Sequence, residues 1–199
     1  DISNLAYALI HHFPNFYSYF GIEELTFNNI TQPNRNGLVG EEGIDGLKTG
    51  HTDAGGYGVV ISGKDKESRF IVTVNGLLSE KARLDEAKKL FVWAKHNYTT
   101  YNYASKNKTI TNIKVVGGSE SSINLVAKED IALCLPNTAN TKALKAEIIT
   151  QNNIKAPLST EKSIGTLRIT LDESQYDFPL FPEKDVKSSW NWRNLFKQG

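Results

Sequence analysis

The pattern of apolar residues changes near Tyr98, and this change constrains the fold more than any other feature. Before it, residues 2–13 and 80–96 carry apolar side chains at helical spacing, and residues 57–62 and 70–74 form β-branched runs. After it, apolar and polar residues alternate in short runs: Ile123 and Leu125; Ile131, Leu133 and Leu135; Leu167, Ile169 and Leu171. The sequence therefore predicts an α+β fold in which a mixed α/β part is followed by a small antiparallel β-sandwich.

We expect four segments along the chain. Residues 1–99 form the mixed part, and the polar, Tyr- and Asn-rich residues 100–108 form a linker. Residues 109–184 form the antiparallel β-rich domain, and residues 185–199 form an amphipathic tail. Within the first part, the Asn-rich residues 28–37 are predicted to be a loop.

The second predicted helix has a clear start signal. Ser79 is suited to the N-cap position, because its hydroxyl can accept a hydrogen bond from a backbone N–H of the first turn. The apolar stripe expected to pack on a sheet consists of Leu84, Ala87, Leu90, Phe91 and Ala94.

Composition excludes several classes of protein. The chain has 199 residues with 23 Lys and Arg against 22 Asp and Glu, so a strongly basic nucleic-acid binder is disfavoured. Cys134 is the single cysteine, which rules out an internal disulfide and a Cys-rich zinc site. The sequence has no methionine, and its first residues do not resemble a signal peptide, so we expect a mature or internal segment of a longer protein.

Residues 45–57 form the most distinctive segment, Asp-Gly-Leu-Lys-Thr-Gly-His-Thr-Asp-Ala-Gly-Gly-Tyr. A strand with Lys48 and Thr49 offers an ammonium and a hydroxyl on alternate positions, and Gly50 leaves room for another backbone. Such a strand can pair with an extended peptide while its cation meets a terminal carboxylate. For the three-residue match alone, a solvated edge strand explains the pattern equally well.

The whole segment resembles the D-alanyl-D-alanine carboxypeptidases, the low-molecular-weight penicillin-binding proteins with the pattern D-G-[LI]-K-T-G-H-T-x-x-A/G-G-Y. Residues 8–18, 27–28 and 34–38 resemble the same family. The K-T-G triplet is one of the signature motifs of penicillin-binding proteins and class A β-lactamases. The resemblance implies the C-terminal part of a β-lactamase/transpeptidase-like α/β catalytic domain followed by the β-rich domain, with no cofactor and no metal.

The resemblance also implies a substrate-binding wall. Lys48 would set the electrostatic field beside the nucleophile, and Thr49 and Arg83 would meet the terminal carboxylate of the substrate. His51 lies two positions after Thr49, so it shares the same face of the strand. The implied wall consists of Lys48, Thr49, Gly50, His51, Arg83 and Arg35.

The two serine motifs of the family are missing from their expected place. In the family, the nucleophile and base lie in S-x-x-K and a second serine lies in S-x-N, both before K-T-G; here the 47 residues before Lys48 contain neither. Later matches to S-x-x-K, residues 105–108 and 159–162, fall in polar connectors, where a lysine would not be desolvated enough to act as a base. Residues 122–124 and 189–191 match S-x-N. We expect no catalytic residue in this segment, with the nucleophile and base upstream of Asp1.

The parent protein is then expected to be a serine-type hydrolase that removes the terminal D-alanine through an acyl-enzyme and is a target of β-lactams. The expected partners are the peptidoglycan pentapeptide ending in D-Ala-D-Ala, β-lactams and the missing N-terminal part, in the bacterial periplasm. The segment alone is predicted to be inactive.

The end of the chain suggests contact with the outer face of the cytoplasmic membrane. Residues 185–199 interleave apolar and basic side chains, and Trp192, Leu195 and Phe196 fall on one side of a helix. Such a segment is far too short to span a bilayer but suits an interfacial amphipathic helix. The alternative is a C-terminal helix whose tryptophans pack on the β-rich domain.

Other functions have weaker support. Residues 58–65 nearly match a P-loop, but Asp65 replaces the hydroxyl that would bind the metal. The four histidines match no metal motif, and a triad using His51 and Asp53 stays open, although no G-x-S-x-G turn presents a serine. A non-catalytic cell-wall adaptor with a vestigial K-T-G half is the main alternative. A natural reading frame with both serine motifs upstream would favour the enzyme.

Overall fold

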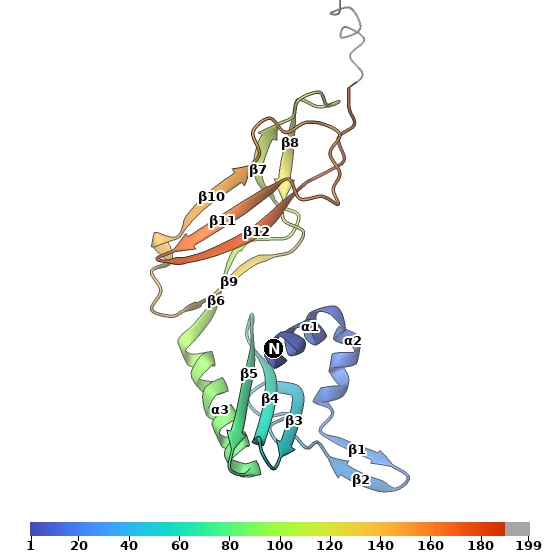
Figure 1. The fold of residues 1–199 in the computed structure, drawn as a ribbon, viewed down its shortest axis with the longest axis vertical. Helices are drawn as coiled ribbons and strands as arrows, with labels where there is room; N and C mark the ends of the chain where they lie inside the picture. Colours follow the sequence, from blue (N-terminus) through green and yellow to red (C-terminus); the bar gives the residue numbers. More distant parts are fainter. Residues whose placement is uncertain (190–199) are drawn as a thin grey trace, which may run out of the picture. The chain divides into compact units, whose positions relative to one another are not determined.

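The computed structural model describes residues 1–189, and the contacts within the chain divide it into two units (Figure 1). The first unit comprises Asp1–Thr100 with Cys134–Asn137, and the second comprises Tyr101–Leu133 with the chain from Thr138 onward. Both units contain antiparallel sheets, and the three α-helices of the described chain lie in the first unit. The predicted fold class, a mixed α/β part followed by a sheet-rich part, is confirmed.

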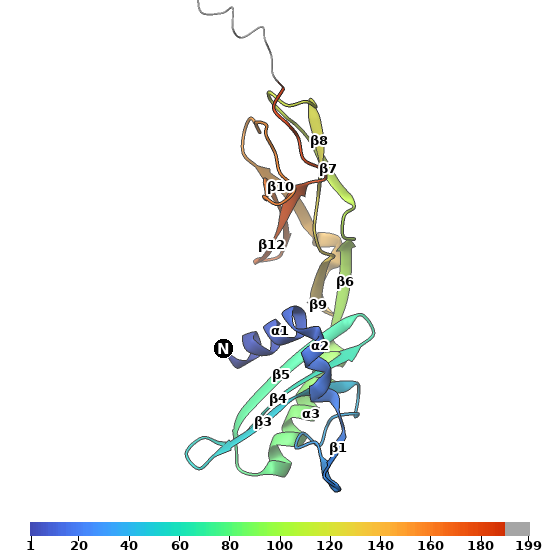
Figure 2. The ribbon, with the colours of Figure 1, turned by 90° about the vertical axis from the view of Figure 1, so that its right-hand side faces the viewer.

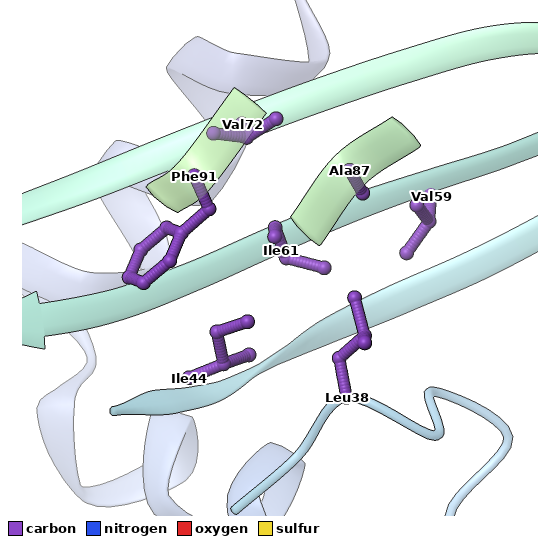
Figure 3. Packing of buried hydrophobic residues seen from close by; sticks show 7 residues of the cluster. All are labelled: Leu38, Ile44, Val59, Ile61, Val72, Ala87 and Phe91. Carbon is purple, nitrogen blue, oxygen red and sulfur yellow. The ribbon is translucent and has the colours of Figure 1, made fainter. Parts of the chain in front are cut away.

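A three-stranded antiparallel sheet forms the centre of the first unit. Its strands are β3 (Ile44–Thr52), β4 (Gly56–Asp65) and β5 (Ser68–Leu77), in the order β3-β4-β5. The helix α3 (Glu80–Asn97) follows β5 and covers one face of the sheet (Figure 2). The buried cluster between them consists of Leu38, Ile44, Val59, Ile61, Val72, Ala87 and Phe91 (Figure 3).

The helix α1 (Ile2–His12) contacts β4 and β5 on the opposite face of this sheet. The Ser3 hydroxyl lies 2.9 Å from the Thr73 hydroxyl, and Thr73 is paired with Val60. Because neighbouring residues of a strand point to opposite faces, Val60 faces away from the α3 side to which Val59 and Ile61 point. The sheet is therefore packed between two helices.

After α1, the chain forms a short helix, α2 (Pro14–Tyr17), a 3₁₀ turn, η1 (Ser18–Gly21), and a hairpin of β1 (Glu24–Phe27) and β2 (Ile30–Pro33). The predicted loop over residues 28–37 is therefore wrong at residues 30–33, which form β2. The two turn residues, Asn28 and Asn29, adopt φ angles of 49° and 60°, a conformation that asparagine tolerates well. All eight strand residues are exposed, so neither strand buries an apolar face, although Leu25 and Phe27 alternate with polar residues.

The α3 helix begins as predicted, because the Ser79 hydroxyl accepts a hydrogen bond from the Ala82 N–H at 3.1 Å. Ala87 and Phe91 of the predicted stripe are buried, whereas Leu90 is 42% exposed, so its assignment to the stripe is wrong. Arg83 is buried on the same side of the helix as Ala87 and Phe91, four and eight residues earlier. An arginine at this position cannot be recognised by a search for apolar residues.

The near-match to a P-loop lies entirely within β4 and forms no phosphate-binding turn. Its second glycine, Gly63, serves packing: a Cβ atom there would lie 2.6 Å from Cζ of Phe91 and 2.7 Å from the carbonyl oxygen of Gly43.

A five-stranded antiparallel sheet in the order β10-β11-β12-β8-β7 forms most of the second unit. Its strands are β7 (Thr109–Lys114), β8 (Ser122–Val126), β10 (Lys145–Thr150), β11 (Gly165–Leu171) and β12 (Ser174–Pro182). The long strand β12 pairs with β11 up to Leu180 and then with β8 through Phe181 and Pro182. The short 3₁₀ turn η2 (Thr141–Ala143) precedes β10.

The alternating apolar residues predicted for this unit are buried in the strands β8, β11 and β9 (Ile131–Pro136). The strand β9 pairs with β6 (Tyr98–Ala104) in a two-stranded sheet. Most of β6 falls in the segment predicted to be a linker, residues 100–108, so this segment contains regular structure up to Ala104. The strand was not predicted because the polar side chains of this segment are typical of a linker.

The predicted tail begins later than expected, because residues 185–189 belong to the β-rich unit. Val186 is buried and exchanges two backbone hydrogen bonds with Leu158, at 2.9 and 3.0 Å. The N–H of Ser189 donates to the Gly117 carbonyl at 2.8 Å. The predicted membrane-binding residues Trp190, Trp192, Leu195 and Phe196 lie outside the described residues.

Removal of Phe91 should destabilise the first unit. The ring is fully buried and packs edge-to-face on Phe70, with ring centroids 6.2 Å apart. We expect Phe91→Ala to lower the free energy of unfolding by about 3–5 kcal/mol, measured by urea unfolding read from amide signals of β4. The neighbouring Leu90→Ala should change it by less than about 1 kcal/mol; equal effects of the two variants would contradict this packing.

Candidate functional site

The K-T-G triplet lies on β3, which is at the edge of its sheet. Among the described residues, β3 pairs with β4 alone, so no strand occupies its other edge, where Asn36 binds the Gly46 carbonyl. Lys48 pairs with Val60 and Thr49 with Val59, so the two side chains point to opposite faces. Lys48 is exposed on the face that α1 contacts, whereas Thr49 is buried on the α3 face.

A pocket of about 220 Å³ brings three of the predicted site residues together. Arg35, Lys48 and Thr49 all line it, with an aromatic contribution from Tyr19 and Phe20. The ammonium of Lys48 donates to the carbonyl oxygen of Thr49 at 2.6 Å, which keeps the charge close to the strand. Two cations therefore lie at a single pocket on the side of β3 that has no strand partner among the described residues, and Thr49 also contributes to its lining.

Two asparagines fix the loop that carries Arg35. The Asn34 amide donates to the Ile22 carbonyl at 2.9 Å, and its oxygen accepts from the Asn36 N–H at 2.9 Å. The Asn36 side chain is 1% exposed and donates to the Gly46 carbonyl, at the start of β3, at 3.0 Å. Arg35 is thus exposed between two anchored residues, so its backbone is already in place for a ligand.

Arg83 lies behind the strand and not in this pocket. It is 4% exposed, and its Nη1 atom lies 3.4 Å from the Gly50 carbonyl oxygen. Its guanidinium carbon lies 5.6 Å from the centre of the Tyr57 ring, and it pairs with Glu80. This differs from the expected direct contact with a carboxylate: in this structure Arg83 supports the K-T-G strand.

His51 and Gly50 are also outside the pocket lining. His51 pairs with Tyr57, and their rings stack with centroids 4.0 Å apart, so it shares the face of Thr49 as expected. It lines a different cavity of about 360 Å³ with Asp53 and Leu78, and the described residues of that lining include no serine for a triad. A Cβ atom at Gly50 would meet no described atom within 4 Å, so packing within the chain does not require glycine there.

A buried network at the start of β3 holds the strand in position. Arg69 of β5 contacts both carboxylate oxygens of Asp45, at 2.8 and 2.7 Å, and donates to the Ser62 hydroxyl at 2.8 Å. The Tyr17 hydroxyl at the end of α2 donates to Asp45 at 2.5 Å. The network therefore joins α2 and all three strands three residues before Lys48.

The pKa values in this network are shifted in consistent directions. Burial, followed by the hydrogen bond to Asp45, raises the pKa of the Tyr17 phenol from 10.0 to about 12. Burial tends to raise the pKa of Asp45, but the hydrogen bonds from Arg69 and Tyr17 outweigh it and hold the pKa below its ordinary value. The hydrogen bond to Asp45 in turn raises the pKa of Arg69.

Sequence reasoning missed three residues that shape the site: Tyr17, Asn36 and Arg69. One signal was present in Gly46, where a Cβ atom would lie 2.8 Å from the Tyr17 hydroxyl. A glycine that follows an aspartate in a strand thus indicates that another group approaches the strand backbone closely. It does not identify Tyr17, which lies 28 positions before Asp45.

The downstream matches to the serine motifs do not resemble catalytic sites. Residues 105–108 are exposed between β6 and β7, and residues 159–162 are exposed in the connection between β10 and β11. Neither is on a helix, and the lysine of each match is exposed. Residues 122–124 begin β8, and residues 190–191 of the last match lie outside the described part of the chain.

Two further features were searched for in residues 1–189. No group of three or more His, Cys, Asp or Glu side chains comes together there in a way that could hold a metal ion. In the same range, no helix combines the length and the apolarity needed to cross a membrane.

Comparison with known proteins identifies the family to which the chain belongs. The family model for D-alanyl-D-alanine carboxypeptidase matches residues 1–77, and that for the C-terminal domain of penicillin-binding protein 5 matches residues 98–188. The D-alanyl-D-alanine carboxypeptidase DacD of Salmonella typhimurium is 33% identical over 172 residues, and DacA of Escherichia coli K12 is 35% identical over 175. These matches cover 85% and 86% of the chain.

The fold agrees with this class. The crystal structure of penicillin-binding protein 5 from Haemophilus influenzae matches with a TM-score of 0.78 and 32% identity, over 91% of this chain and 54% of that one. The chain therefore belongs to the D-alanyl-D-alanine carboxypeptidase family of penicillin-binding proteins. It spans 44% of the length of the Salmonella relative and 43% of that of the E. coli relative.

The Tyr17 phenol should make stability fall at high pH. Its pKa is about 12 in the folded state and about 10 when unfolded, so its stabilising contribution is complete below pH 10 and is lost as the pH rises through 12. We expect the free energy of unfolding of the wild type to fall by roughly 2–3 kcal/mol more than that of Tyr17→Phe between pH 10 and 12. Urea unfolding across this range measures the difference, and parallel pH profiles would refute it.

Proposed function

We propose that this chain forms the substrate-binding wall of a serine-type D-Ala-D-Ala carboxypeptidase. The enzyme would remove the terminal D-alanine from peptidoglycan peptides through an acyl-enzyme and would be acylated by β-lactams. The observation that carries the proposal is the single pocket that unites Arg35, Lys48 and Thr49 at the open edge of β3. The nucleophile and base would come from sequence outside these 199 residues.

The chemistry of this pocket suits a peptide with a terminal carboxylate. The open backbone of β3 can pair with an extended peptide by strand addition. Arg35 and Lys48 provide two positive charges at the pocket, and hydrogen bonds from charged donors to a carboxylate are stronger than neutral ones. Lys48 would also lower the energy of negative charge that develops at a neighbouring acyl group.

Arg83 would act indirectly. Its guanidinium is buried against the Gly50 carbonyl and the Tyr57 ring, so it would keep the backbone of the K-T-G strand in the register that the substrate needs. His51, stacked on Tyr57, would extend the same wall.

An exposed apolar surface in the first 30 residues supports a further part of the same protein as partner. Large exposed apolar patches usually mark interfaces, and here several side chains are more than half exposed: Leu5, Tyr7, Phe13, Phe16, Tyr19, Leu25, Phe27 and Ile30. They belong to α1, α2, η1 and the β1–β2 hairpin, before the K-T-G strand. We assign this surface to the upstream part that carries the two serine motifs.

The cellular location follows from the proposed substrate. Peptidoglycan is polymerised outside the cytoplasmic membrane, so we place the enzyme in the bacterial periplasm. Residues 187–199, with two tryptophans among basic residues, would associate with the membrane surface. Removal of these residues should abolish co-sedimentation of the chain with anionic liposomes at low salt, and equal sedimentation with and without them would refute the anchor.

Substitution of Lys48 tests the proposed wall. In the enzyme that carries both serine motifs, Lys48→Ala should lower the rate of acylation by penicillin by about 10²-fold or more, the effect of losing one preorganised electrostatic group. Intact-mass spectrometry at short reaction times measures the acyl adduct. Lys81→Ala, an exposed lysine in the first turn of α3, is the matched control and should acylate at the wild-type rate.

The second part of this experiment is the same measurement of the penicillin adduct on the 199-residue chain alone. It should form no penicillin adduct, because it lacks the family's nucleophile in its expected place. An adduct mapped to Ser105 or Ser159 would overturn the assignment of the nucleophile. A Lys48→Ala enzyme that acylates normally would overturn the role of the K-T-G wall.

A further inference from the structure

A cavity of about 780 Å³ in the second unit has no role in the function proposed above. The end of β10, the start of β11 and the connection between these two strands line it. Its volume lies within the range of about 300–1,000 Å³ that is typical of small-ligand sites. It is built entirely from residues of one unit and shares none with the pocket at Lys48.

Backbone hydrogen bonds fix one wall of this cavity. The N–H of Val116 donates to the Ile154 carbonyl at 2.8 Å, and the N–H of Ala156 donates back to the Val116 carbonyl at 3.0 Å. Leu158 is buried and exchanges two backbone hydrogen bonds with Val186. The connection is therefore pinned to two separate segments of the unit, although it contains no helix or strand.

The opposite wall is also fixed. The N–H of Ile164 donates to the Leu180 carbonyl at 3.0 Å, and the Ser163 hydroxyl donates to the same carbonyl at 3.1 Å. Because both walls are anchored to the sheet or to neighbouring segments, the cavity exists before any ligand arrives. A preformed site avoids the entropic cost of ordering a loop on binding.

The charge in the cavity is of one sign. Lys155 and Lys162 line it, and no carboxylate does. Two acidic residues at the connection are engaged elsewhere: Glu161, next to Lys162 in the sequence, pairs with Lys128 at 3.2 Å, and Asp185 accepts from the Thr160 N–H at 2.7 Å. Among residues 1–189, neither lining lysine has an ion-pair partner, so both remain available to an anion.

The other lining groups favour a peptide over a sugar. Side-chain amides and hydroxyls alternate with aliphatic side chains: Thr150, Gln151, Asn153, Ser159, Ser163 and Thr166 with Ile149, Ile154, Pro157, Leu158 and Ile164. Among residues 1–189, the lining contains no aromatic ring on which a sugar ring could stack. Aliphatic contacts, neutral hydrogen-bonding groups and two cations together match a short peptide that carries carboxylates.

We propose that this cavity is a second binding site, which takes a short anionic peptide. Resting on the proposed function, we identify the peptide as the acidic stem of peptidoglycan, bound through carboxylates that precede the D-alanines. The site would hold the enzyme on its polymeric substrate independently of the K-T-G wall. Binding at two sites on one polymer raises the effective concentration of the second interaction.

The test uses the stem tripeptide L-alanyl-γ-D-glutamyl-diaminopimelate, which has free carboxylates but no D-Ala-D-Ala end. Titrated into the ¹⁵N-labelled 199-residue chain, it should shift amide signals of residues 149–166. Shifts at residues 34–36 and 48–50, where the K-T-G wall could take its terminal carboxylate, are counted separately. The same peptide with amidated carboxylates should not bind, and salt should weaken binding of the acidic form.

Charge reversal supplies the matched variants. Lys155→Glu/Lys162→Glu should weaken binding at least tenfold, whereas Lys142→Glu/Lys145→Glu, at exposed lysines outside the cavity, should change it less than twofold. Unchanged amide signals of β11 away from the cavity show that a variant is folded. Binding that survives the first pair, equal loss in both pairs, or no shift at residues 149–166 would overturn the proposal.

The two proposals can fail separately. Peptide shifts confined to residues 34–36 and 48–50 would refute the second site and leave the K-T-G wall intact. Normal acylation of Lys48→Ala alongside peptide binding at residues 149–166 would refute the wall and leave the second site.

Discussion

The bidentate contact between Asp45 and Arg69 is the interaction on which the rest of the candidate site depends. With Tyr17 above it, this pair joins α2 to all three strands at the point where β3 begins. A partly buried ion pair adds little net stability, but loss of one partner leaves an uncompensated charge, so its main effect is to specify position. The register of β3, and with it the placement of Lys48, follows from that constraint.

The parts of the fold that sequence could predict are those with a local signal. The strands β4 and β5 and the helix α3 follow from apolar periodicity and from the Ser79 cap, because their neighbours bury one face of each. The β1–β2 hairpin and β6 escaped prediction, since the two hairpin strands have only four residues each and most side chains of all three strands are exposed. Backbone pairing alone defines these strands, and a single sequence does not reveal it.

The candidate site likewise has features that the sequence could predict and features that it could not. Strand alternation correctly placed His51 on the face of Thr49. The family-like segments 34–38 and 45–57 included Arg35 and Lys48, which the structure brings to one pocket. The burial of Arg83 could not be foreseen, because it depends on where α3 packs against the sheet. Arg69 lies 24 residues after Asp45, and only the pairing of β3, β4 and β5 brings the two together.

The two proposed binding sites share one electrostatic design in a chain whose net charge is only +1. A Debye length of about 8 Å at physiological salt screens the field of distant charges, so a nearly neutral chain exerts little long-range attraction on anions. Paired cations without a lining carboxylate, Arg35 with Lys48 and Lys155 with Lys162, create local positive potential at fixed cavities instead. Recognition then requires that a carboxylate enter one of these two cavities. This requirement favours a short peptide that fits the cavity over polyanions in general.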